Sequence, residues 1–190
     1  MLHFLLDGLH PDSYAEISHA AFELGCRLNT RFAIHRHKAT LPSSGIVVSY
    51  GGETGSLIVP RSRSPVGLTQ IDGIWCYAAP AETPDIFRGT ADLLSFRHET
   101  ASTDSGDKFG RVAPASNPLG ARLREPLIEN NALLLKGFVE RTGATMEKCS
   151  TPFGEGRYAV CMTHDVDGPQ LHSAFALLRA SLLALRGDKY

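Results

Sequence analysis

Two aspartates near the end of the chain, Asp165 and Asp167, stand at a spacing suited to metal-assisted hydrolysis. They follow an apolar run at 160–162 and precede a Gly-Pro pair. A carboxylate at the end of a buried strand is unfavourable unless a proton, a cation or hydrogen bonds compensate it. One aspartate could hold a metal ion while the other removes a proton from water. The alternative is structural, because aspartates also cap helices and bond turn amides.

The segments around the two aspartates predict a strand, a turn and a helix. Residues 158–163 form a short apolar strand, and residues 171–186 carry leucines at helical spacing. Ligands of α/β folds bind outside the carboxyl ends of parallel strands, which is where both aspartates would fall. We expect this strand–helix unit to pack on the preceding domain or on a second copy of the chain, because exposed leucines drive self-association.

Residues 163–169, Thr-His-Asp-Val-Asp-Gly-Pro, resemble the first motif of the polysaccharide deacetylase family, the NodB-like carbohydrate esterases. The resemblance implies that Asp165 is the catalytic base and Asp167 a metal ligand, with Val166 between two aspartates that are usually adjacent. It also implies a divalent metal, zinc first, and a polysaccharide or oligosaccharide substrate. The family's later motifs, including a His-x-x-x-His pair, have no counterpart in these 190 residues. We therefore expect this chain alone to be inactive, and metal to bind only in a completed site.

Weaker similarity to this family begins upstream, at residue 85. The segments at 85–87, 93–99, 107–111 and 124–127 occur in the order found before this motif in deacetylase-like proteins from bacterial polysaccharide gene clusters. The resemblance implies an N-terminal domain of unknown role at 1–150. It further implies that residues 156–190 are the first strand–helix unit of a NodB-like (β/α) barrel, truncated here.

The residue pattern of 1–150 itself predicts an α/β domain. A first helix is expected from a Ser13–Glu16 capping box to Gly25. Further helices are expected from Thr83-Pro84 to about 97 and from Glu125-Pro126 to about 141. Strands are predicted at 31–35, 45–50, 56–59 and 73–77. Strands early in the chain and helices later indicate the α/β class.

Three further places are candidate sites. His35 and His37 could present two imidazoles on one strand face, but no acidic or thiol side chain nearby completes a metal set, so a solvated edge strand is the better interpretation. The run at 51–55, Gly-Gly-Glu-Thr-Gly, lacks the lysine of a phosphate-binding loop and favours a hairpin or strand-to-strand turn. His172 is interpreted as a surface or partly buried histidine.

Composition argues against several classes of partner. The chain has 19 basic and 20 acidic residues, a net charge of −1, which gives no electrostatic footprint for nucleic acid or an anionic membrane. Residues 1–10 lack the basic start of a signal peptide and are too short to span a bilayer. The 4 cysteines lie far apart, which indicates reduced thiols. We expect a cytoplasmic protein without nucleic-acid or membrane partners.

Three functions follow from these observations. The leading hypothesis is the N-terminal part of a metal-dependent deacetylase-like hydrolase that removes acyl groups from amino sugars. An alternative is a haloacid-dehalogenase-like phosphohydrolase, whose Asp-x-Asp-Gly-Thr motif also follows an apolar strand, although Pro169 replaces the threonine here. The third is a non-catalytic accessory or interaction domain at 1–150, because no self-sufficient catalytic set precedes His164.

Overall fold

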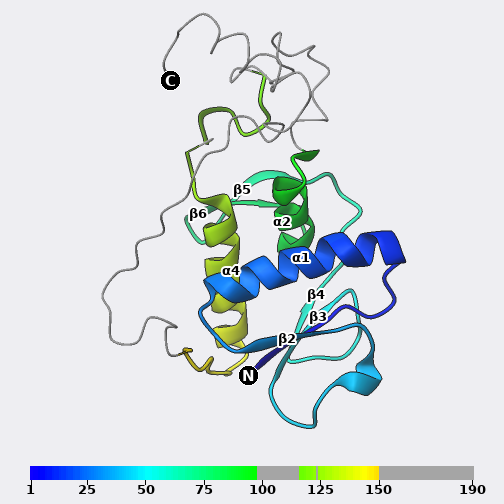
Figure 1. Ribbon diagram of the computed structural model, residues 1–190. Helices are drawn as coiled ribbons and strands as arrows, with labels where there is room; N and C mark the ends of the chain where they lie inside the picture. Colours follow the sequence, from blue (N-terminus) through cyan, green and yellow to red (C-terminus); the bar gives the residue numbers. More distant parts are fainter. Residues whose placement is uncertain (98–115, 123, 150–190) are drawn as a thin grey trace, which may run out of the picture. The chain divides into compact units, whose positions relative to one another are not determined.

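The computed structural model describes residues 1–97, 116–122 and 124–149 (Figure 1). The chain divides into two compact units, Met1–Thr151 and Pro152–Tyr190, and the described residues all belong to the first. In chain order the described elements are β1 (Leu2–Leu5), α1 (Pro11–Arg27), β2 (Phe32–His35), η1 (Lys38–Thr40), β3 (Ile46–Tyr50), β4 (Leu57–Val59), β5 (Gly67–Ile71), β6 (Ile74–Ala78), α2 (Ile86–Leu94), η2 (Gly120–Arg122) and α4 (Leu127–Arg141).

A parallel sheet with the strand order β2-β1-β3-β4 organises this part of the chain. β1 pairs on one side with β2, where Leu2 lies opposite Phe32, and on the other side with β3, where Leu2 lies opposite Ile46. β4 continues the sheet beyond β3, with Val48 opposite Leu57. The α/β class predicted from the sequence is confirmed for the described residues.

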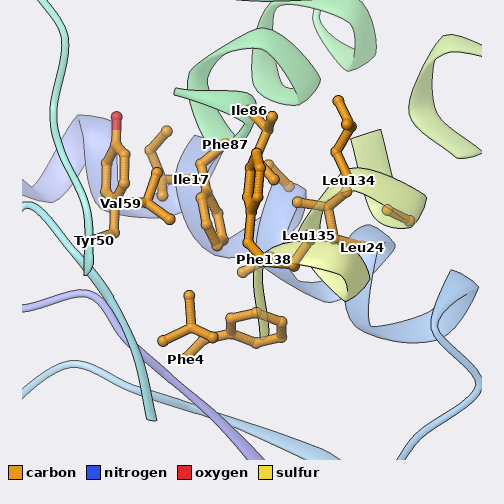
Figure 2. Close-up of a cluster of buried hydrophobic side chains, with 14 of the residues drawn as sticks. Phe4, Ile17, Leu24, Tyr50, Val59, Ile86, Phe87, Leu134, Leu135 and Phe138 are labelled. Carbon is orange, nitrogen blue, oxygen red and sulfur yellow. The ribbon is translucent and has the colours of Figure 1, made fainter. Parts of the chain in front are cut away.

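The helices α1, α2 and α4 cover one face of this sheet. Side chains alternate along a strand, so Leu2, Phe4 and Leu6 point to the same side, and all three belong to the main core. That core also contains Ile17, Ala20, Ala21 and Leu24 of α1, Ile86, Phe87 and Ala91 of α2, and Ala132, Leu134, Leu135, Phe138 and Val139 of α4 (Figure 2). Each fully buried leucine or phenylalanine stabilises the fold by about 1.5–3 kcal/mol.

The first helix differs from its prediction at both ends. α1 begins at Pro11, a favoured first helical residue, and its N-cap His10 makes no side-chain capping bond, so the predicted Ser13–Glu16 capping box is wrong. Gly25, predicted to end the helix, lies inside it. A Cβ at Gly25 would come within 2.6 Å of the Phe32 ring, so the glycine allows α1 to pack closely on β2.

A separate antiparallel hairpin, β5–β6, is held by α4. Its two-residue turn, Asp72 and Gly73, has φ angles of 50° and 80°, as type I′ turns require. The amide of Asn131 in α4 bonds the backbone of Tyr77 in β6 twice, accepting from its N–H at 3.3 Å and donating to its carbonyl at 3.0 Å. Asn131 also donates to Thr90 in α2 at 3.0 Å. One buried amide thus joins α4, β6 and α2.

The predicted strands at 31–35, 45–50, 56–59 and 73–77 correspond to β2, β3, β4 and β6. β1 and β5 were not predicted from the sequence. Of the two interpretations of the run at 51–55, the hairpin is wrong because β3 and β4 are parallel, whereas the strand-to-strand turn is confirmed. The helices predicted from 83 and 125 are found as α2 and α4, and α2 ends a few residues early, before Phe96 with its φ of 55°.

None of the helices in the described part of the chain has the length and apolar character that a membrane crossing needs. The cysteines described there, Cys26, Cys76 and Cys149, are free thiols. The predicted strand at 158–163, the predicted helix at 171–186 and Cys161 lie outside the described residues.

Candidate functional site

The carboxyl ends of the adjacent parallel strands β1 and β3 lie side by side, and the chain leaves them in opposite directions along the sheet. β1 leads through α1 to β2 on one side of the sheet order, whereas β3 leads through residues 51–56 to β4 on the other side. In parallel sheets the loops that leave two adjacent strands in opposite directions open a crevice, which is the usual place for a ligand. The strand order therefore predicts a ligand site at the carboxyl ends of β1 and β3.

A buried tyrosine–aspartate pair forms one wall of this crevice. Tyr50, the last residue of β3, donates its hydroxyl to a carboxylate oxygen of Asp85 at 3.0 Å, and both side chains are buried. Asp85 is the N-cap of α2 and also accepts the backbone N–H groups of Arg88 at 3.0 Å and Ser62 at 3.1 Å. The pair therefore fixes the start of α2 against the end of β3.

Burial dominates the titration of this pair. It raises the pKa of Asp85 above its ordinary value, and the hydrogen bonds from the backbone of Arg88, from Ser62 and from Tyr50, together with the charge of Arg88, oppose that shift in part. Burial also raises the pKa of Tyr50, and the neighbouring Asp85 charge adds to the effect. Tyr50 therefore stays protonated at neutral pH and acts as a hydrogen-bond donor, not as a base or a nucleophile.

Arg61 ties the two strand ends together. Its guanidinium donates to the carbonyl oxygens of Asp7, of Gly8 at 3.1 Å and of Tyr50 at 3.4 Å, so it spans from the end of β1 to the end of β3. Gly51 makes room for it: the φ of Gly51 is 70°, and a Cβ there would lie 2.3 Å from Nε of Arg61. The first glycine of the 51–55 run thus allows an arginine to lie across the sheet edge.

Arg88 approaches the same place from the first turn of α2. Its Nη1 donates to the carbonyl oxygens of Ser62 at 2.9 Å and Ser64 at 3.1 Å, so it holds the segment that follows β4. Among the residues that the structure describes, neither Arg61 nor Arg88 forms an ion pair with a carboxylate. Both cations are bonded to neutral carbonyl groups.

A cavity of about 200 Å³ lies between these groups and α1. We call it the sheet-end cavity, and its polar and charged lining consists of Ser13, Glu16, Tyr50, Arg61, Arg88 and Arg97. Arg97 pairs with Glu16 on α1 and, at 3.0 Å, with Asp92 on α2. The lining thus combines three arginines with one glutamate, and within the described ranges Arg61 and Arg88 are the two that form no ion pair.

The predicted catalytic residues belong to the part of the chain beyond residue 149. Asp165, Asp167 and His172 lie outside the described residues, so their roles as base, metal ligand and surface histidine remain predictions. Within the described ranges, no group of three or more His, Cys, Asp or Glu side chains is arranged to hold a metal ion.

His35 and His37 do not share a strand face. β2 is an edge strand, as expected, but it ends at His35, and His37 lies beyond it with Nδ1 3.7 Å from a carboxylate oxygen of Asp7. His35 instead lies with Nε2 3.0 Å from Nδ1 of His3 in β1. Burial, the charge of His35 and the N-terminal amine lower the pKa of His3. Two imidazoles alone fall short of the ligand count of a protein zinc site.

Comparisons with protein-family models, curated proteins and solved structures give no match for this chain. The deacetylase resemblance therefore rests on the sequence motifs alone.

The sheet-end cavity was not foreseen from the sequence. One signal was present: Asp85 directly precedes an apolar helix, the usual place of an N-cap. No local pattern could show that its carboxylate would also meet Tyr50, 35 residues earlier. The arginines carried no signal, since Arg61 and Arg88 look like ordinary surface residues in the sequence.

Proposed function

We propose that this chain is the N-terminal part of a metal-dependent deacetylase-like hydrolase that acts on acylated amino sugars of a polysaccharide or oligosaccharide. The observation that carries the proposal is the Thr-His-Asp-Val-Asp-Gly-Pro sequence at 163–169. Residues 156–190 would then open a (β/α) barrel whose later strands supply further ligands.

The motif assigns separate tasks to its two aspartates. Asp165 would take a proton from the attacking water, and Asp167 would be one ligand of a divalent ion, zinc first. Such an ion, when bound, polarises the acyl carbonyl and stabilises the developing oxyanion. Asp167 alone falls short of the three protein ligands of a usual catalytic zinc site, so the proposal requires further ligands beyond this motif.

The deacetylase proposal is tested with the longest natural reading frame that contains residues 1–190. Asp165→Asn should abolish acetate release from an acetylated oligosaccharide while metal stays bound, because it removes the base and leaves the metal ligand Asp167 in place. Asp167→Asn should reduce both activity and metal content. Asp12→Asn, at an exposed aspartate in the first turn of α1, is the matched control and should change neither. Equal metal loss in both motif variants, or full activity in Asp165→Asn, would refute the assignment.

The same preparation separates the phosphohydrolase alternative. A phosphorylated aspartate trapped at Asp165 during turnover of a phosphate ester would replace the deacetylase proposal with that class. For the 190-residue chain itself, calorimetric titration with zinc should be nearly silent. Tight binding that Asp167→Ala abolishes and His35→Ala does not would show that the metal site is complete within this chain.

A second candidate is the non-catalytic accessory domain. It is favoured by the compactness of the unit Met1–Thr151 and by a core that the helices and the sheet build together. If the first unit is accessory, proteolysis of the longer protein between the two units should release a C-terminal fragment that still frees acetate. Loss of all activity on cleavage, with both fragments still folded, would show that the first unit is part of the catalytic assembly.

A further inference from the structure

Two cations of the sheet-end cavity, Arg61 and Arg88, form no ion pair with a carboxylate among the described residues. Arg97 is paired with Glu16 and Asp92, whereas Arg61 and Arg88 bond only to backbone carbonyl oxygens among the described residues. The charge of Arg88 interacts with the carboxylate of Asp85, but this carboxylate is fully buried and accepts its hydrogen bonds from Tyr50, Ser62 and the backbone of Arg88, not from the Arg88 guanidinium. Glu16 is the only carboxylate in the described lining of the cavity.

Both guanidinium groups keep donors for a ligand. A guanidinium has five N–H groups. Arg61 uses three of them on the carbonyls of Asp7, Gly8 and Tyr50, and Arg88 uses two on the carbonyls of Ser62 and Ser64. The bonds to the backbone also fix both side chains, so little side-chain entropy is lost when a ligand binds.

Two other cavities among the described residues have a different character. One, of about 480 Å³ between α2 and the start of α4, is largely apolar and carries Glu125 and Glu129. Another, of about 530 Å³, carries Asp72 and Glu82 beside one arginine, which is itself paired with Asp72. Among these three cavities, only the sheet-end cavity has more arginines than carboxylates in its lining.

We propose that the sheet-end cavity binds a small tetrahedral oxyanion of the phosphate type, either free phosphate or the phosphate group of a small metabolite. Two arginines without an ion-pair partner suit the charge of about −1.5 to −2 that a phosphate group carries at neutral pH, which is more than a single carboxylate carries. Arginine forks bind such oxygen atoms in pairs. The hydroxyl of Ser13 adds a neutral donor on the α1 side of the lining.

The size of the cavity limits what is attached to the anion. Pockets for drug-sized ligands have volumes of about 300–1,000 Å³, and this one has about 200 Å³. A phosphate ion or a short phosphate monoester is the matching class. The inference concerns the first unit alone and does not depend on the deacetylase proposal.

The test is calorimetric titration of the intact 190-residue chain with inorganic phosphate, with acetate and with glycerol 3-phosphate. We expect one phosphate per chain, and acetate at least tenfold weaker. Glycerol 3-phosphate binding tenfold tighter than phosphate would identify a monoester as the ligand, and equal binding would identify the free ion. Absence of phosphate binding, or acetate binding as tight as phosphate, would overturn the proposal.

Variants locate the site. Arg88→Met should weaken phosphate binding at least tenfold, whereas Arg141→Met, at an exposed arginine outside this cavity, should not. Because Arg88 also holds the segment after β4, a second variant avoids the scaffold: Ser13→Asp adds a carboxylate to the lining at an exposed position of α1. It should weaken binding at least tenfold, and Ala15→Asp, exposed on the same helix but outside the lining, should leave it unchanged. Equal affinity in Ser13→Asp and the unaltered chain would refute the location.

Discussion

Gly89 in α2 sits so close to β6 that a single methyl group should separate the two elements. A Cβ at Gly89 would lie 1.7 Å from the carbonyl oxygen of Tyr77, 2.6 Å from its carbonyl carbon and 2.9 Å from Cα of Ala78. Every one of these atoms is backbone, so no side chain can turn away. The substitution Gly89→Ala therefore forces α2 and β6 apart.

The size of the effect follows from that distance. Real Cβ contacts are essentially never shorter than 3.0 Å, so the gap must grow from 1.7 Å by at least 1.3 Å. Inserting a methyl group into a packed core costs about 1–3 kcal/mol when the surroundings can relax. Here α2 carries the fully buried Ile86 and Phe87, whose contacts loosen with it. We expect the free energy of unfolding to fall by about 3 kcal/mol or more, which lowers the melting temperature by about 6–12 °C.

Two other helical glycines serve as internal controls. A Cβ at Gly137 in α4 would meet no atom within 4 Å beyond the backbone of its own helix and its chain neighbours, so Gly137→Ala should stabilise the chain by about 0.5–1 kcal/mol through helix propensity. Gly25→Ala meets the Phe32 ring, a side chain that can shift, and should give an intermediate loss. Urea unfolding followed by circular dichroism at constant m-value measures all three. A Gly89→Ala variant as stable as the unaltered chain would show that α2 does not lie this close to β6.

Three further predictions concern buried polar groups and thiols. Asn131→Ala should lower the free energy of unfolding by about 2–4 kcal/mol, because it removes three buried hydrogen bonds, two to the backbone of Tyr77 and one to Thr90. Asn130→Ala, which loses one partly buried bond, should cost about 1 kcal/mol or less, and urea unfolding measures both. Burial raises the folded-state pKa of Asp85, so the stability that its protonated form contributes is complete below about pH 4 and is lost as pH rises through that pKa. Between pH 4 and pH 7 the free energy of unfolding of the unaltered chain should therefore fall relative to that of Asp85→Asn. A difference between the two proteins that stays constant with pH would contradict this. Burial raises the pKa of the Cys76 thiol to about 11, so iodoacetamide at pH 8 should alkylate the exposed Cys26 long before Cys76, as peptide mass spectrometry would show.

The elements with strong local patterns could be predicted from the sequence. β3 is an apolar run bounded by glycines, and α4 combines apolar periodicity with a proline before its first residue and Gly143, with a φ of 81°, after its last turn. β1 escaped prediction because its four residues, Leu-His-Phe-Leu, are all buried and show no alternation of polar and apolar types. β5 escaped because a single apolar pair in Gly-Leu-Thr-Gln-Ile gives little signal.

The sheet-end cavity depends on contacts that no local pattern encodes. Arg61 reaches the carbonyl of Gly8 across 53 positions of sequence, and Asp85 reaches Tyr50 across 35. Such pairs form only when the strand order of the sheet is known. The site at Asp165 and Asp167 is the opposite case, because a local sequence motif predicts it while both residues lie outside the described part of the chain.

The position of β1 at the centre of the sheet has a consequence for biosynthesis. Its residues leave the ribosome before those of both partner strands. The partners of Leu2 come 30 and 44 positions later, at Phe32 on one side and at Ile46 on the other. Until β3 has been translated, the nascent chain exposes an apolar tetrapeptide with two bare edges, the kind of segment to which chaperones and other nascent chains bind. Codons that slow translation between residues 6 and 45 would lengthen this exposure, whereas slow codons after Tyr50 would not.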